Sequence, residues 1–105
     1  VDESLSETAG RELLEETGYR ANKITLLLSS PTSAGMTNET THFFAATDLI
    51  HETEGGGNEH EDITVHHVPM ENLASWLASK QSEGLLIDFK IHACVCLAQQ
   101  QNIIK

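Results

Sequence analysis

Apolar residues recur at helical spacing near the start of the chain. In residues 3–17, Leu5, Ala9 and Leu13 alternate with charged side chains, and Gly18 follows in the position of a C-terminal cap. Apolar residues three to four positions apart form one stripe along a helix, and glycine ends helices because it tolerates a left-handed backbone. The pattern therefore predicts a helix over residues 3–17.

Three later segments have the character of strands. Residues 23–29 form a short apolar run, residues 39–49 are rich in Thr and Phe, and residues 63–68 alternate between apolar and polar side chains. Such runs, bounded by turn-forming residues, are typical of strands. Residues 31–38 and the acidic, Gly-rich residues 52–61 are predicted loops.

Helical spacing returns after Pro69. Residues 70–79 predict a short amphipathic helix with Trp76 in the core, and residues 88–103 predict a longer C-terminal helix. The order helix, strand, strand, strand, helix, helix indicates an α+β fold in which at least two strands pair antiparallel.

The length and charge of the chain limit the classes of partner and function that it can have. A chain of 105 residues is expected to form a single domain. Its net charge of -10, from 16 acidic and 6 basic residues, lacks the basic stripe that nucleic acid requires. No apolar run reaches the length of a membrane span, so neither nucleic acid nor membrane is an expected partner. The acidity also suits divalent cations at a site, although for the net charge alone solubility is the preferred explanation.

The cysteines point to a reducing compartment. Cys94 and Cys96 are two positions apart in a predicted helix, where side chains point to different sides. They are expected to be free thiols in a cytoplasmic protein.

Three carboxylates share one side of the first predicted helix. Glu12, Glu15 and Glu16 fall within an arc of roughly 100°. Like charges three and four residues apart repel, so the cluster needs solvent or a cation. Mg²⁺ prefers oxygen ligands and bridges carboxylates to phosphates. A solvated helix face is the alternative interpretation.

The sequence around this cluster resembles a known motif. From Glu3 to Tyr19 the chain reads E-x7-R-E-L-x-E-E-T-G-Y, which is similar to the Nudix box, G-x5-E-x7-R-E-U-x-E-E-x-G-U, where U is a bulky apolar residue. The resemblance implies that Glu12, Glu15 and Glu16 bind the metal. It also implies that Arg11 orients them through an ion pair, with Glu15 and Arg11 counted among the catalytic residues.

The rest of the chain looks like the ADP-ribose pyrophosphatase branch of that family. Gly35, Thr37 and Glu39 occupy its substrate-binding loop, in which Ala34 replaces the usual proline. A mobile loop before a strand carries the catalytic base in that branch, which here implies Glu59 first and Glu61 second. An ordinary charged loop residue is the alternative for each.

The resemblance implies Mg²⁺-dependent hydrolysis, with Mn²⁺ as the other candidate metal. The substrate is a small nucleoside diphosphate linked to another moiety, of the ADP-ribose or nucleotide-sugar type. The products are a nucleoside monophosphate and a second phosphorylated compound. The expected fold is a Nudix-like α/β/α sandwich with a mixed sheet, in one partial domain over residues 1–105 without the N-terminal strands.

Three explanations account for the chain beginning inside the motif. It is a fragment of a longer hydrolase, a short protein whose homodimer partner covers the open sheet edge, or a non-catalytic binding module derived from the family. An open edge and uncovered apolar surface favour self-association. A dimer is therefore expected.

Overall fold

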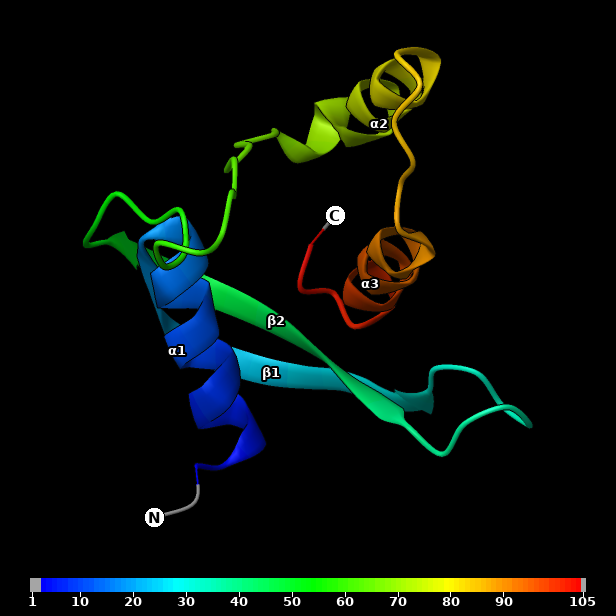
Figure 1. Cartoon of the computed structure of the whole chain (residues 1–105), viewed down its shortest axis with the longest axis horizontal. Helices are drawn as coiled ribbons and strands as arrows, with labels where there is room; N and C mark the ends of the chain where they lie inside the picture. Colours follow the sequence, from blue (N-terminus) through cyan, green and yellow to red (C-terminus); the bar gives the residue numbers. More distant parts are fainter. Residues whose placement is uncertain (1–2, 105) are drawn as a thin grey trace. The chain divides into compact units, whose positions relative to one another are not determined.

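The computed structural model describes residues 3–104. The chain forms two compact units, Val1–Val65 and His66–Lys105. Unit 1 contains one helix and a β-hairpin, and unit 2 contains helices joined by short loops (Figure 1). The candidate chemistry lies in unit 1.

Helix α1 covers Leu5–Thr17, and both of its ends are fixed by side-chain and backbone caps. The Ser4 side chain accepts a hydrogen bond from the backbone N–H of Glu7, whose carboxylate accepts one from the Ser4 backbone in return. At the other end, Gly18 has a φ of 81° and donates its N–H to Leu14. The predicted helix is confirmed, and it begins after Ser4 because that residue is the N-cap.

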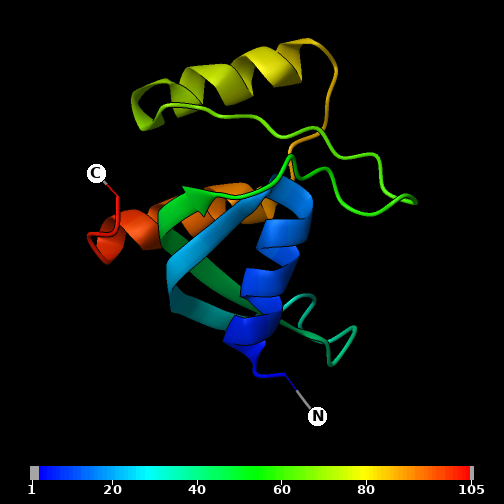
Figure 2. The same cartoon turned by 90° about the vertical axis from the view of Figure 1, so that its left-hand side faces the viewer.

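The hairpin consists of β1, Tyr19–Pro31, and β2, Thr40–His51. These strands pair antiparallel, from Tyr19 opposite His51 to Pro31 opposite Thr40, with an irregularity between Leu26 and Leu28. Both predicted strands are confirmed, and both are longer than predicted. Helix α1 lies along the hairpin (Figure 2). Gly10 permits this approach, because a Cβ there would lie 3.0 Å from the Ile24 side chain.

The prediction of a strand over residues 63–68 is wrong. These residues form neither helix nor strand, and in the described part of the chain the sheet contains only β1 and β2. Alternation shows that a segment suits a sheet but not that a partner exists, and an unpaired strand is not stable. The His66 ring instead lies 5.0 Å from the ring of Trp76.

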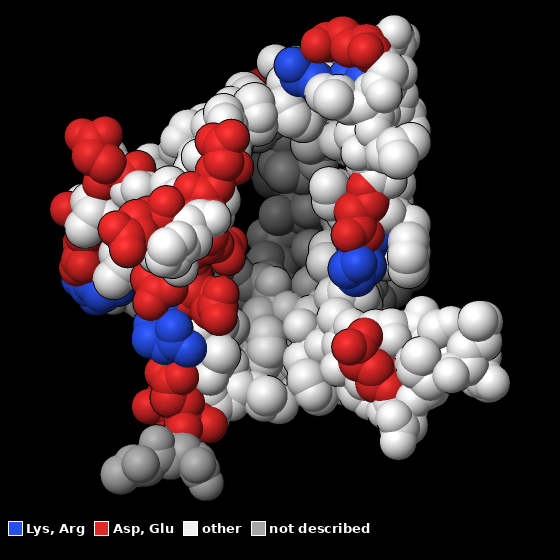
Figure 3. Space-filling view, viewed as in Figure 1, with Lys and Arg blue, Asp and Glu red and all other residues white. Residues whose placement is uncertain are grey.

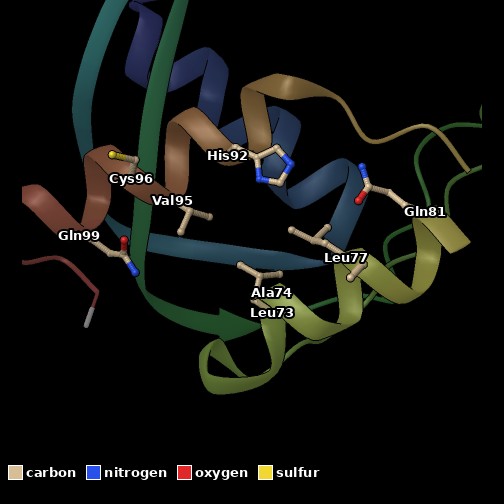
Figure 4. Close-up of a pocket in the computed structure, with 9 residues that line it drawn as sticks. Leu73, Ala74, Leu77, Gln81, His92, Val95, Cys96 and Gln99 are labelled. Atoms are coloured by element: carbon tan, nitrogen blue, oxygen red, sulfur yellow. The ribbon is translucent and has the colours of Figure 1, made fainter.

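Unit 2 contains a 3₁₀ turn over Met70–Asn72, helix α2 over Leu73–Ser82 and helix α3 over Phe89–Gln100. Both predicted helices are confirmed with shifted bounds, and Asp88 caps α3 through the Lys90 N–H. A groove of about 280 Å³ between α2 and α3 is lined by apolar side chains that include Leu77 and Val95 (Figure 4). Trp76 is only half-buried.

The α+β class predicted from the sequence is confirmed, in the form of helices plus a two-stranded antiparallel sheet. The mixed sheet and the single domain stay predictions. Cys94 and Cys96 are free thiols, as expected. Within residues 3–104, no helix is long and apolar enough to cross a membrane.

Candidate metal centre

The carboxylates of α1 form an acidic face, which we define as Glu12, Glu15 and Glu16. Glu12 and Glu15 are exposed, whereas Glu16 is half-buried. Acidic side chains gather over α1 and the loop that follows β2 (Figure 3). The sequence prediction that these residues share one side of a helix is consistent with their positions on α1.

Glu16 lies at the most crowded point of the acidic face. Burial raises the pKa of its carboxyl group, and the negative charges of Glu12, Glu61 and Glu15 raise it further. The charge of Glu61, which lies in the loop after β2, therefore acts on the acidic face, and a bound cation would relieve the repulsion among these carboxylates.

A glycine loop, Gly55–Gly57, fastens the segment after β2 to the C-terminal turn of α1. Gly56 donates its N–H to the carbonyl of Glu16 at 2.7 Å, and Gly57 donates to the carbonyl of Glu15 at 2.9 Å. Carbonyls in the last turn of a helix have no partner within the helix. The glycine loop supplies these partners and brings its own side chains to the acidic face.

Close backbone contact beside this loop depends on two glycines. A Cβ at Gly18 would lie 2.0 Å from the Thr53 carbonyl oxygen, and one at Gly55 would lie 2.4 Å from the Thr17 carbonyl carbon. Both residues also have positive φ values, 81° and 73°. The sequence identified this run only as a loop. Three consecutive glycines just before the acidic Asn58–Glu61 stretch were the available signal.

The structure distinguishes the two candidate bases. The Glu61 carboxylate accepts a hydrogen bond from the Asn58 N–H at 3.0 Å, and the Glu61 N–H donates to the Asn58 carbonyl. Glu59, in contrast, has a side chain that is 86% exposed and that contacts His60. Of the two residues, Glu61 is the one whose charge raises the pKa of Glu16, although the sequence favoured Glu59 as the base. The catalytic role of either residue stays a prediction.

Arg11 links the start of α1 to the acidic face. It contacts Glu3 at 3.0 Å and Glu15 at 3.2 Å. Hydrogen bonds to Glu3 and Glu15 raise the pKa of Arg11, and the bond from Arg11 lowers the pKa of Glu3. Four-residue spacing along the helix lets Arg11 reach Glu7 or Glu15, and the ion pair is with Glu15.

The predicted substrate-binding residues lie elsewhere in unit 1. Gly35, Thr37 and Glu39 occupy the turn between β1 and β2. That turn follows the pair Pro31–Thr40, whereas the acidic face adjoins the other end of the hairpin, at Tyr19–His51. Strands of this length extend about 40 Å, so the hairpin keeps these groups apart. Their role in binding substrate stays a prediction.

The donor set of the acidic face fits a hydrated divalent cation. Within residues 3–104, no group of three or more His, Cys, Asp or Glu side chains lies close enough together to hold a metal ion. Mg²⁺ does not require such a group, because it commonly binds one or two carboxylates and completes its shell with water and phosphate oxygens. The adjacent carboxylates of Glu12 and Glu16 supply that minimum.

Comparison with known proteins adds an independent finding. The NUDIX domain family model matches residues 1–89. The chain is 34% identical to a GDP-mannose pyrophosphatase of Pectobacterium atrosepticum, over 90% of this chain and 50% of that protein. It is 37% identical to an ADP-ribose pyrophosphatase of Bacillus subtilis, over 70% of this chain and 40% of that protein.

A third relative is not named as a pyrophosphatase. A methanol dehydrogenase activator of Bacillus methanolicus is 29% identical over 93% of this chain and 51% of that protein. The chain thus spans at most about half the length of these curated relatives. No solved structure gives a significant match.

Proposed function

The chain belongs to the Nudix domain family, and from this premise we propose that it hydrolyses the diphosphate linkage of a nucleoside diphosphate joined to another moiety. The products are a nucleoside monophosphate and a second phosphorylated compound. The observation that carries this proposal is the attachment of the Glu61-bearing loop to the last turn of α1, through the hydrogen bonds from Gly56 to Glu16 and from Gly57 to Glu15. This attachment brings candidate metal-binding oxygens and a candidate base into one region of unit 1.

Nucleotide sugars and ADP-ribose are the substrate class that we propose. Relatives named GDP-mannose pyrophosphatase and ADP-ribose pyrophosphatase support this choice. The charge of the site agrees with it, because a diphosphate approaching several carboxylates must arrive with divalent cations.

Each residue of the site has a proposed task. Glu12 and Glu16 hold Mg²⁺, with Glu15 beside them. The bound cation supplies positive charge against the diphosphate oxygens. Glu61 accepts the proton of the attacking water, for which a carboxylate near the acidic face is suited. Arg11 keeps Glu15 in place through its ion pair.

The test is the release of monophosphate from GDP-mannose and ADP-ribose as Mg²⁺ is added, comparing the parent with Glu16→Gln. Turnover should require the metal and should fall about 100-fold in the variant, because a metal-binding carboxylate has been removed. Glu71→Gln removes the same charge from an exposed position in unit 2 and is the matched control. Equal turnover in Glu16→Gln and the control would refute the proposed site.

A second candidate function is supported by a different observation. Several large apolar side chains of the hairpin are exposed, including Leu26 at 49% and Leu49 at 47%. An apolar surface of this kind suits contact with another protein chain. A non-catalytic interaction module would bind through the hairpin and show no metal-dependent turnover.

A further inference from the structure

The segment that carries Glu61 takes its position from the backbone of α1. The carbonyls of Glu15 and Glu16 accept hydrogen bonds from Gly57 and Gly56. These carbonyls belong to the same residues whose carboxylates form the acidic face. The backbone of the helix end therefore holds the glycine loop, while the side chains of the same two residues belong to the acidic face.

Gly57 lies directly against the side chain of Glu61. A Cβ built on Gly57 would lie 2.8 Å from the Glu61 Cβ and 2.9 Å from its Oε1. Such distances are shorter than van der Waals contact, so any side chain at this position would push Glu61 away. Gly57 also has a φ of 82°, which L-residues rarely adopt. Gly56 has a similar φ of 95°, but a Cβ built on it would have no neighbouring atom within 4 Å.

Asn58 completes the connection between the loop and the carboxylate. Its N–H donates to Glu61 Oε1 at 3.0 Å, and its carbonyl accepts the Glu61 N–H at 3.0 Å. Its side-chain oxygen also accepts the N–H of His60 at 2.8 Å. Asn58 and Glu61 are thus the two ends of a small turn that directly follows Gly57.

We propose that Gly57 and Asn58 are positioning residues that place the Glu61 carboxylate against the acidic face, an inference that rests on the proposed hydrolysis. Gly57 leaves the space that Glu61 occupies, and the Asn58 N–H fixes the direction of its carboxylate. The position of the base is thereby tied to the helix that carries the metal ligands. Both residues act through Glu61 and touch neither substrate nor metal.

The kinetic test compares Gly57→Ala with Gly56→Ala, which introduces the same methyl group at a similar positive φ but without the contact to Glu61. We expect kcat to fall at least tenfold further in Gly57→Ala than in Gly56→Ala, with little difference in KM. Glu61→Gln should lower kcat by about 100-fold, as expected for loss of a base. The double variant Gly57→Ala/Glu61→Gln should be no slower than Glu61→Gln alone, because both changes remove the same function.

A second measurement does not depend on turnover or on the folding of Gly57→Ala. Amide hydrogen exchange of Asn58 in the metal-free protein should accelerate at least tenfold in Glu61→Ala, which removes the acceptor of its N–H. Glu59→Ala is the control, because its exposed side chain accepts no hydrogen bond from Asn58 in the structure. Circular dichroism checks that the two variants have the same helical content.

The outcomes separate this inference from the function on which it rests. Equal exchange of Asn58 in Glu61→Ala and Glu59→Ala would overturn the positioning role even if the parent hydrolyses its substrate. Equal losses in Gly57→Ala and Gly56→Ala, or additive losses in the double variant, would also overturn it. Absence of turnover in the parent, with the exchange difference intact, would overturn the proposed hydrolysis and the positioning role with it.

Discussion

Individual residues of α1 divide between holding the helix and forming the site. Glu7 serves the N-terminal cap, whereas Arg11 joins Glu3 to Glu15. Glu16 is the carboxylate most affected by its neighbours, since burial and three like charges raise its pKa. The charged residues of this one helix thus serve its cap, its ion pairs or the acidic face.

Arg11 should matter more for metal use than its exposure suggests. We expect Arg11→Ala to lower turnover at limiting Mg²⁺ by about tenfold, because Glu15 loses the partner that orients it. Arg11→Lys should recover part of this loss, since it keeps the charge but not the forked geometry. Turnover measured across Mg²⁺ concentrations checks this. Arg20→Ala, which breaks the Arg20–Glu52 pair on the hairpin, is the control, and equal losses in both would contradict the role of Arg11.

Asp88 is expected to make the stability of unit 2 depend on pH, in a direction that follows from its pKa shift. Hydrogen bonds from the side chain and backbone of Lys90 lower the pKa of Asp88 below its ordinary value of 3.8. A carboxyl group with a lowered pKa in the folded state stabilises that state above the unfolded pKa and loses this effect as pH falls through the folded value. Asp88→Ala should therefore unfold more easily near neutral pH, and its difference from the parent should disappear in strong acid.

Urea unfolding followed by Trp76 fluorescence measures this difference, because Trp76 lies in the same unit. Asp62→Ala, in an exposed loop of unit 1, controls for loss of charge. A difference between Asp88→Ala and the parent that stayed constant from neutral to strongly acidic pH would contradict the assignment.

At the scale of elements, the sequence predicted well where the signal was local. Ser4 and Gly18 cap the two ends of α1, and each hairpin strand pairs with the strand that is next to it in the sequence. The strand predicted over residues 63–68 failed because pairing depends on a distant partner that alternation cannot reveal. The choice between Glu59 and Glu61 as the base stays a prediction, and the sequence could not show the turn between Asn58 and Glu61, because that turn depends on how the glycine loop meets the helix.

The junction between α1 and the loop after β2 predicts a specific glycine requirement. Gly18→Ala should destabilise the protein well beyond the 1 kcal/mol or so that positive φ costs an alanine, because its Cβ would meet the Thr53 carbonyl oxygen at 2.0 Å. Gly35→Ala has a similar φ of 84° and open space around it, so it isolates the cost of the backbone conformation. Urea unfolding followed by far-ultraviolet circular dichroism measures both. Equal destabilisation would show that the close approach has no energetic importance.

At the scale of the whole molecule, few apolar side chains are buried among the described residues. Among the described residues, only Leu77 and Ala98 are buried apolar side chains, each 6% exposed. A core this small leaves apolar surface that association can cover. The sequence predicted the α+β class and an uncovered apolar surface, but not which side chains stay exposed, because that depends on how much surface the elements bury together.

We expect the protein to form a homodimer through the hairpin. Light scattering after size exclusion should give about twice the monomer mass of 11.5 kDa. Leu26→Lys should shift the mass toward the monomer, because it places a charge on the exposed hairpin surface. Leu86→Lys, at a position that is 99% exposed in unit 2, is the control. A monomeric parent at all concentrations would contradict the expected dimer.

The most direct test of the proposed site is Mg²⁺-dependent monophosphate release measured side by side for the parent, Glu61→Gln and Glu59→Gln. The proposed site predicts turnover that is abolished by chelation and lowered about 100-fold by Glu61→Gln. The loss in Glu59→Gln should be at least tenfold smaller, since Glu61, and not the largely exposed Glu59, is the residue whose charge acts on Glu16. A larger loss in Glu59→Gln, or turnover that survives chelation, would contradict the proposed site.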